Sequence, residues 1–182
     1  MKPVLKGIFA FGMLGLIVSC ASAPTTETNK SPGLITKIYV LVDVGDWKYE
    51  GGDFGTYLAT NLEKKMQQDG VDTKAGSVTG LELDKDKYKK EMSDFGATKI
   101  MLVRLSGITT NDSFEVIHGV FDISILDAPN LDAPNIPTVW RAKIAADGPT
   151  APGNTGWVDH SVDADNLIDN IISALRKHGL MK

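Results

Sequence analysis

Two short stretches hold residue types that could support nucleophilic catalysis. Asp159-His160-Ser161 contains the three side chains of a catalytic triad, but neighbours in sequence cannot point at one another as a triad requires. Gly76–Gly80 has the glycine spacing of a nucleophile elbow, but its central residue is Val78, which offers no hydroxyl. Ser161 or Asp163 is better suited to capping the last helix. Neither stretch predicts a hydrolase, and we expect this protein not to be an enzyme.

Phosphate and metal chemistry also have candidate residues. Glu50–Gly55 lies where a phosphate loop would, but it lacks both the GxGxxG spacing and a Walker lysine. Asp84 and Asp86 begin like a calcium loop, but the central glycine and the closing glutamate do not follow. The three histidines are far apart, and none has a metal-ligand partner four residues away. The sequence therefore predicts no metal site and no cofactor.

Cys20 is the single cysteine among the 182 residues. One thiol excludes an internal disulfide framework and a cysteine-rich zinc site. The net charge of −4, from 19 basic and 23 acidic side chains, argues against a nucleic-acid partner, which would require a basic excess. The length favours one domain plus its terminal segments. Function is therefore best approached through the position of Cys20.

The residues before Cys20 have the pattern of a targeting segment. Residues 1–19 hold no acidic side chain, and their charges are Lys2 and Lys6. The apolar run Gly7–Val18 follows, which fits the short hydrophobic region of a secretory signal. A membrane-spanning helix needs about 20 apolar residues, more than this run supplies. We predict that residues 1–19 are a signal peptide.

The five residues that end at Cys20 (LIVSC) resemble the lipobox of bacterial lipoproteins, with branched Ile17 three positions before the cysteine and small Ser19 just before it. The resemblance implies that Cys20 receives a diacylglyceryl thioether, that the chain is cut before it, and that the new amine is acylated. Two or three acyl chains anchor a protein stably. Ala21, in place of aspartate, implies sorting to the outer membrane with the domain facing the periplasm. The membrane is then contacted through the lipid on Cys20.

After Cys20 the composition changes twice. Residues 20–33 (CASAPTTETNKSPG) show no apolar periodicity and predict a lipidated cysteine followed by a flexible linker. A tether of this length has a root-mean-square reach of about 20 Å. Residues 34–182 predict the periplasmic domain. Without the two lysines of the signal, the mature chain has 17 basic and 23 acidic side chains, a net charge of −6.

The hydrophobic pattern of residues 34–182 predicts a single α/β domain. The continuous apolar run Lys37–Val44 is typical of a buried parallel strand, and Asp53–Gln68 has the four-residue spacing of an amphipathic helix. Around residues 121–125 and 140–144, apolar and polar residues alternate, which indicates antiparallel strands with one wet face. The prediction is a sandwich whose mixed sheet joins a parallel βαβαβ part to an antiparallel hairpin, packed with about three helices. The further elements are expected at Val71–Ala75, Asp86–Phe95, Lys99–Leu105 and Asp163–His178.

Aromatic side chains in predicted loops are candidates for a partner-binding surface. Trp47 and Tyr49 follow the first strand, and Trp157 lies in a late Gly/Pro-rich loop. Large aromatics on loops can anchor a protein interface, although they can equally fold back over the edge of the core. Trp140 alternates inward in its strand, so we expect it in the core.

The order of elements in the mature chain resembles a group of small envelope lipoproteins. This group comprises the curli secretion lipoproteins, the amino-terminal domain of the Tol-system propeller protein and the lipoprotein activators of penicillin-binding proteins. The resemblance is carried by the lipobox, by KIYVLVDV, by FDISILDA with VWRA, and by the closing LIDNIISALRKHGLM helix. It implies a non-enzymatic lipoprotein that presents its domain to an envelope protein partner in assembly or regulation. A lipoprotein that binds a small lipid or glycan, or an envelope hydrolase, is the alternative.

Overall fold

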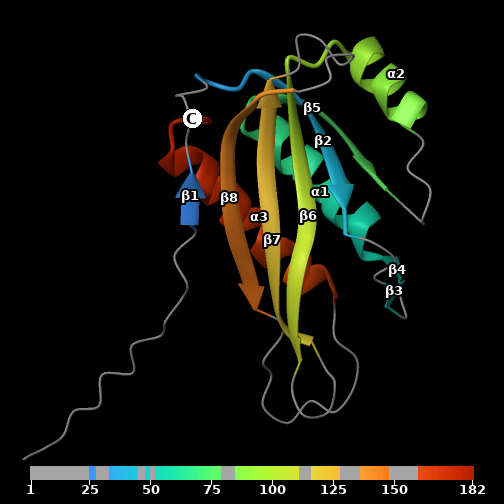
Figure 1. Ribbon diagram of the computed structural model, residues 1–182, viewed down its shortest axis with the longest axis vertical. Helices are drawn as coiled ribbons and strands as arrows, with labels where there is room; N and C mark the ends of the chain where they lie inside the picture. The colour runs from blue at the N-terminus through green and yellow to red at the C-terminus, as the bar shows by residue number, and fades with distance from the viewer. Residues whose placement is uncertain are drawn as a thin grey trace, which may run out of the picture.

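The chain folds into a mixed sheet with helices on both faces (Figure 1). The computed structural model describes residues 25–27, 33–44, 48–49, 52–78, 85–110, 116–127, 136–147 and 160–182. The elements, in chain order, are β1 (Thr25–Glu27), β2 (Lys37–Asp43), β3 (Lys48–Tyr49), β4 (Gly52–Asp53), α1 (Phe54–Gln68), β5 (Asp72–Ser77), α2 (Lys85–Phe95), β6 (Lys99–Thr110), β7 (Val116–Asp127), β8 (Thr138–Asp147) and α3 (His160–Lys177).

The main sheet has the strand order β1-β8-β7-β6-β2-β5. β2 is parallel to both of its neighbours, β5 and β6, whereas β6, β7, β8 and β1 pair antiparallel in turn. The prediction of an α/β fold with a mixed sheet is therefore confirmed. The alternating segments around residues 121–125 and 140–144 are the antiparallel pair β7–β8, as their wet faces indicated.

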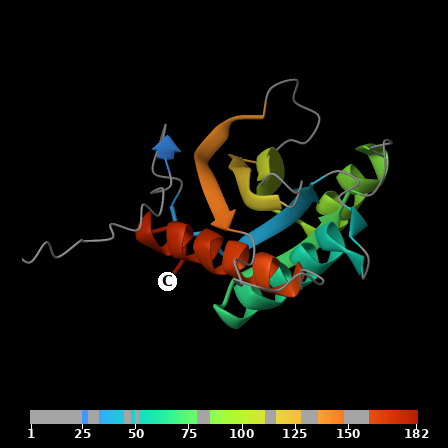
Figure 2. The ribbon, with the colours of Figure 1, turned by 90° about the horizontal axis from the view of Figure 1, so that it is seen from below.

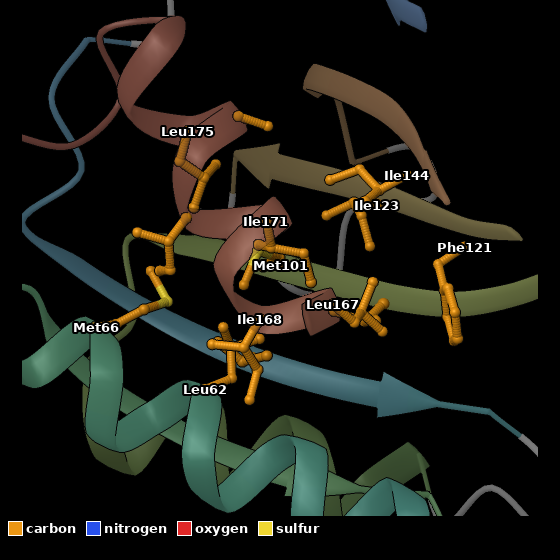
Figure 3. Close-up of a cluster of buried hydrophobic side chains, with 14 of the residues drawn as sticks. Leu62, Met66, Met101, Phe121, Ile123, Ile144, Leu167, Ile168, Ile171 and Leu175 are labelled. Atoms are coloured by element: carbon orange, nitrogen blue, oxygen red, sulfur yellow. The ribbon is translucent and has the colours of Figure 1, made fainter. Parts of the chain in front are cut away.

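The helices divide between the two faces of this sheet (Figures 1 and 2). α1 and α3 lie side by side on one face, which we call the covered face, and α2 packs on the opposite side against β2 and β6. α1 faces the sheet with Phe54, Leu58, Leu62 and Met66, the four-residue series that predicted the helix, and all of them are buried. Figure 3 shows how side chains of α1 and α3 meet those of β6, β7 and β8.

The carboxyl terminus closes the core. Leu180 and Met181 are buried, and the Leu180 carbonyl accepts a hydrogen bond from the Ile35 amide at 2.9 Å. Arg176 binds Asp69 at the end of α1 with 2.7 Å between Nη2 and Oδ1, and its Nε donates to the Lys182 carbonyl at 3.1 Å. Both ends of the domain are therefore held together beside α3.

Several findings differ from the sequence predictions. α3 begins at His160, three residues before the predicted start at Asp163, so Ser161 and Asp163 lie inside the helix and do not precede it as caps. β6 runs to Thr110, five residues past the predicted end at Leu105.

Residues 25–27, inside the segment predicted as a tether without secondary structure, form β1 and pair with β8. Thr25 and Thr26 are β-branched and suit a strand, and the outer edge of β8 offers unpaired backbone groups. The connector after β2 also contains a small antiparallel hairpin, whose strands β3 and β4 have two residues each and in which Tyr49 pairs with Gly52.

Candidate interaction surface

The four residues that the sequence singled out fall largely outside what the structure describes. Cys20, Trp47 and Trp157 lie outside the described residues, so their predicted roles stay predictions. The backbone of Tyr49 lies in β3. Trp140 is 1% exposed and packs in the core, as its place in the alternating strand predicted.

The motifs weighed for catalysis adopt ordinary structure. Val78, at the centre of Gly76–Gly80, is buried, and its amide donates to the Val42 carbonyl at 2.8 Å, which continues the β5 ladder. His160 is the first residue of α3. Within the described ranges, no three His, Cys, Asp or Glu side chains are grouped as a metal site, and no helix has the length and apolarity to cross a membrane.

The charged residues of the central strands gather on the face opposite α1 and α3. Phe121, Ile123 and Ile125 of β7 are buried against the covered face, so the residues between them point the other way. The same alternation holds in β6 and β8. We call this the open face, because α2, the described helix on this side, packs on β2 and the adjoining part of β6 and leaves the rest uncovered. Its polar side chains include Arg104, Asp122, Ser124, Arg141 and Lys143.

Strand register places four of these charges in one line across the sheet. Asp43 is paired with Arg104, Arg104 with Asp122, and Asp122 with Lys143. This charge row alternates acidic and basic side chains over four neighbouring strands. All its members are exposed except Asp122, which is partly buried.

The ion pairs along the open face are loose. The Arg104 Nε lies 3.8 Å from Asp43 Oδ2, and the Arg141 Nη2 lies 3.8 Å from Asp122 Oδ2. Exposed pairs of this kind contribute about 0–1 kcal/mol, so they hold their side chains weakly. The second Asp122 oxygen, Oδ1, is buried without a hydrogen-bond partner among the described residues. The charges of Arg104, Arg141 and Lys143 are exposed and can pair with another molecule, whereas this Asp122 oxygen is not accessible.

α2 bounds the open face through a small polar cluster. The Tyr39 hydroxyl donates to Glu91 Oε2 at 2.7 Å, and the Tyr88 hydroxyl donates to the Ser77 carbonyl at 2.8 Å. Burial, together with the hydrogen-bonded Glu91 carboxylate, raises the pKa of Tyr39 above its ordinary value. A Cβ on Gly76 would lie 2.8 Å from the Tyr39 hydroxyl oxygen, so this position needs glycine for the cluster to form.

The backbone groups at the two edges of the sheet have different hydrogen-bond partners. At the β5 edge, Glu63 Oε2 accepts from the Ala75 amide and Gln67 Nε2 donates to the Thr73 carbonyl, both at 2.8 Å. These side chains of α1 occupy backbone groups that another strand would need. At the β8 edge the structure places β1, whose three residues pair with Arg141 to Lys143.

The sequence showed that apolar and polar residues alternate in β7 and β8. It did not identify Arg104, Asp122, Arg141 and Lys143 as members of one surface. The alternation assigns each side chain to a face, whereas the charge row depends on the register between strands. A line of opposite charges at matching distances from the strand ends is the signal that could have suggested it.

Comparison with known protein families finds no match, and comparison with curated proteins finds no match either. Solved structures do match. PelC from Paraburkholderia phytofirmans, a dodecamer, is 14% identical, with a TM-score of 0.52 over 88% of this chain and 98% of PelC. A single-residue variant of it gives 13% identity and the same TM-score over 87% and 99%. The lipoprotein GNA1162 from Neisseria meningitidis is 12% identical, with a TM-score of 0.42 over 78% and 96%. The likeness to PelC shows that this chain shares its fold.

Proposed function

We propose that this protein is an envelope lipoprotein that acts through protein–protein contact and not through catalysis. A lipid on Cys20 anchors it in the outer membrane, and residues 34–182 face the periplasm. The lipobox resemblance supports the anchor. No metal or cofactor is required for this role.

The charge row is the observation that carries the proposal. Stability alone does not call for alternating charges on a sheet face, because exposed pairs at 3.8 Å contribute little. Complementary charges between proteins accelerate association and select the right partner. A face with exposed Arg104, Arg141 and Lys143 around Asp122 suits a partner surface that carries both signs of charge.

Self-association is the form of this contact that we test first. PelC, which shares the fold, is a dodecamer. An assembly built head to tail requires two different surfaces of each copy to meet, and the open face offers one of them. A different envelope protein on the same face is the other outcome of the test.

The contact is tested by site-specific photo-crosslinking in cells. A photoreactive residue in place of Arg104 or Arg141 should give a covalent adduct, whereas the same residue in place of Lys64, exposed on α1, serves as the matched control. Mass spectrometry of the adduct distinguishes a second copy from another protein. Equal adduct yields at all three positions, or no adduct at any, would contradict the proposed contact.

The anchor is tested separately. A Cys20→Ala variant should lose incorporation of labelled fatty acid and leave the membrane fraction, because Cys20 is the single thiol in the chain. Unchanged labelling would overturn the lipoprotein assignment.

A further inference from the structure

We propose that three side chains, Glu63, Gln67 and Tyr88, close the β5 edge of the sheet against pairing with the β5 strand of a second copy. β5 is the last strand of the main sheet, so one side of its backbone has no strand beside it among the described residues (Figure 1). An edge of this kind is a template for pairing with another chain. The inference does not depend on the lipid at Cys20, and β5 lies outside the charge row.

The hydrogen bonds toward β2 show which residues of β5 turn outward. At the two ends of β5, the Asp72 amide donates to the Thr36 carbonyl at 2.9 Å and the Val78 amide donates to the Val42 carbonyl at 2.8 Å. The backbone groups of successive residues in a strand point to alternate sides of the strand. Asp72 and Val78 both face β2, so every second residue between them presents its amide and carbonyl outward: Thr73, Ala75 and Ser77.

α1 closes the first two of these residues from the covered face. Gln67 Nε2 donates to the Thr73 carbonyl at 2.8 Å, and Glu63 Oε2 accepts from the Ala75 amide at 2.8 Å. The two side chains are also joined to each other, with 3.2 Å between Gln67 Nε2 and Glu63 Oε1. Because they stand four residues apart in α1, one face of this helix follows the edge of the sheet.

α2 closes the third residue from the opposite face of the sheet. Tyr88 is buried, and its hydroxyl donates to the Ser77 carbonyl at 2.8 Å. Gly76 permits this approach, because a Cβ there would lie 3.4 Å from a ring carbon of Tyr88 and 2.8 Å from the Tyr39 hydroxyl oxygen. The hydrogen bond from Tyr39 to Glu91 holds α2 in this position. Helices on both faces therefore contribute to one closed edge.

The positions of these three contacts, which we call the edge caps, match what two paired β5 strands would need. In antiparallel pairing centred on Ala75, this residue would meet its own copy, and Thr73 would meet Ser77 of the other strand. Outward residues that lie directly opposite each other exchange both of their hydrogen bonds. Each of these bonds would use the Thr73 carbonyl, the Ala75 amide or the Ser77 carbonyl. The edge caps therefore block every bond of this register.

A positive charge adds to the effect of the edge caps. Lys74 lies in the middle of β5, and in the same register the two copies of Lys74 would be diagonal neighbours about 7–8 Å apart. Lysine on an edge strand opposes pairing, because the like charges of the two chains repel each other. Pairing at β5 is thus disfavoured through its hydrogen bonds and through its charges.

The test removes the edge caps and measures whether two copies then associate. The triple variant Glu63→Ala, Gln67→Ala and Tyr88→Phe frees the three capped backbone groups. In sedimentation of the purified full-length protein in detergent, we expect it to dimerise at least about tenfold more tightly than the wild type, because several hydrogen bonds become possible. Glu63→Gln, which keeps an oxygen acceptor for the Ala75 amide, and Lys64→Ala, on the exposed side of α1, are the matched controls and should behave like the wild type.

Residue-resolved hydrogen exchange locates the contact. In the wild type, Glu63 protects the Ala75 amide, whereas the amides of Thr73 and Ser77 have no edge cap. In the dimer of the triple variant, the exchange of these last two amides should slow about tenfold or more. Ser77→Pro, added to the triple variant, removes one outward donor at an edge position where proline is tolerated, so it should weaken the dimer.

The double variant Glu63→Ala with Gln67→Ala leaves the contacts of α2 unchanged and keeps the test valid where Tyr88→Phe unsettles the fold. It should dimerise more tightly than the wild type and less tightly than the triple variant. A double variant that unfolds cooperatively in urea and is as monomeric as the wild type would overturn the inference. So would a dimer of the triple variant in which the Thr73 and Ser77 amides exchange as before.

Arg104→Glu separates this inference from the proposed contact through the open face. Added to the triple variant, it should leave the β5 dimer unchanged, because Arg104 lies on β6 and outside the paired edge. A dimer that is lost with Arg104→Glu and kept with Ser77→Pro would form through the open face. That result would overturn the inference about β5 and would leave the proposed function intact.

Discussion

The covered face and the open face of the sheet use the same strands for different ends. In β8, Trp140 is 1% exposed beneath α3, while the next residue, Arg141, points to solvent from the other side. Burying one large apolar side chain contributes about 1.5–3 kcal/mol, whereas an exposed ion pair contributes about 0–1 kcal/mol. The difference teaches that, in the part of the sheet that α2 does not cover, stability resides on the covered face. The open face can therefore carry a pattern chosen for contact with another molecule.

The largest expected effect tests this division at two adjacent residues. Trp140→Ala should lower the free energy of unfolding by about 3–5 kcal/mol, because it empties a large volume between β8 and α3. Arg141→Ala should change it by no more than about 0.5 kcal/mol. Urea unfolding of both variants measures the contrast. Similar losses in the two variants would contradict the assignment of stability to one face.

Gly76→Ala should have the next largest effect, on the side covered by α2. The added Cβ would lie 2.8 Å from the Tyr39 hydroxyl oxygen, which Glu91 holds in place. We expect a loss of about 1–3 kcal/mol, as for other overpacked sites. Tyr39→Phe removes the clashing oxygen, so the double variant should be less destabilised than the two single losses added together. Additive losses in urea unfolding would show that this contact is not the cause.

Tyr39→Phe by itself should cost about 1 kcal/mol at neutral pH, because it removes one hydrogen bond. The pKa of Tyr39 is raised in the folded state, while the unfolded chain ionises near pH 10. The stabilisation from Tyr39 is thus complete below pH 10 and is lost as the pH rises above it. Unfolding measured from pH 8 to pH 11 should therefore show a steeper decline for the wild type than for the variant. Parallel declines would argue against a raised pKa.

The smallest effect on stability is expected at the centre of the charge row. Arg104→Glu places three acidic side chains in succession, but the site is exposed, so unfolding should change by about 1 kcal/mol or less. Association through the open face should weaken about tenfold or more, since like charges oppose a complementary surface. Crosslinking yield and sedimentation at low and high salt measure this. A variant that associates like the wild type would remove the charge row from the interface.

The sequence predicted most helices and strands of the domain correctly. It predicted only part of how the strands pair with one another. Gly96 and Gly179 directly follow the predicted helices Asp86–Phe95 and Asp163–His178, and they adopt φ values of 68° and 69°. The residue type alone was sufficient to predict these helix ends, because only glycine adopts such φ angles readily. The alternation in β7 likewise gave the correct wet face, since side-chain direction follows from strand geometry.

The parts that could not be predicted depend on pairing between distant segments. The charge row requires the registers of β2, β6, β7 and β8, which are set by packing of the whole sheet. β1 required knowing that β8 would be an edge strand, since Thr25–Glu27 lies in a segment whose composition is typical of a linker. The composition of residues 25–27 describes that segment alone, whereas the structure shows that it pairs with β8.

The buried carboxyl terminus has a consequence for how the protein is made. Leu180 and Met181 belong to the core, and the Leu180 carbonyl binds the Ile35 amide near the start of the domain. The core is therefore incomplete until Leu180 and Met181 have been added to the chain and can pack. We expect a chain truncated before Leu180 to unfold more readily than the intact one.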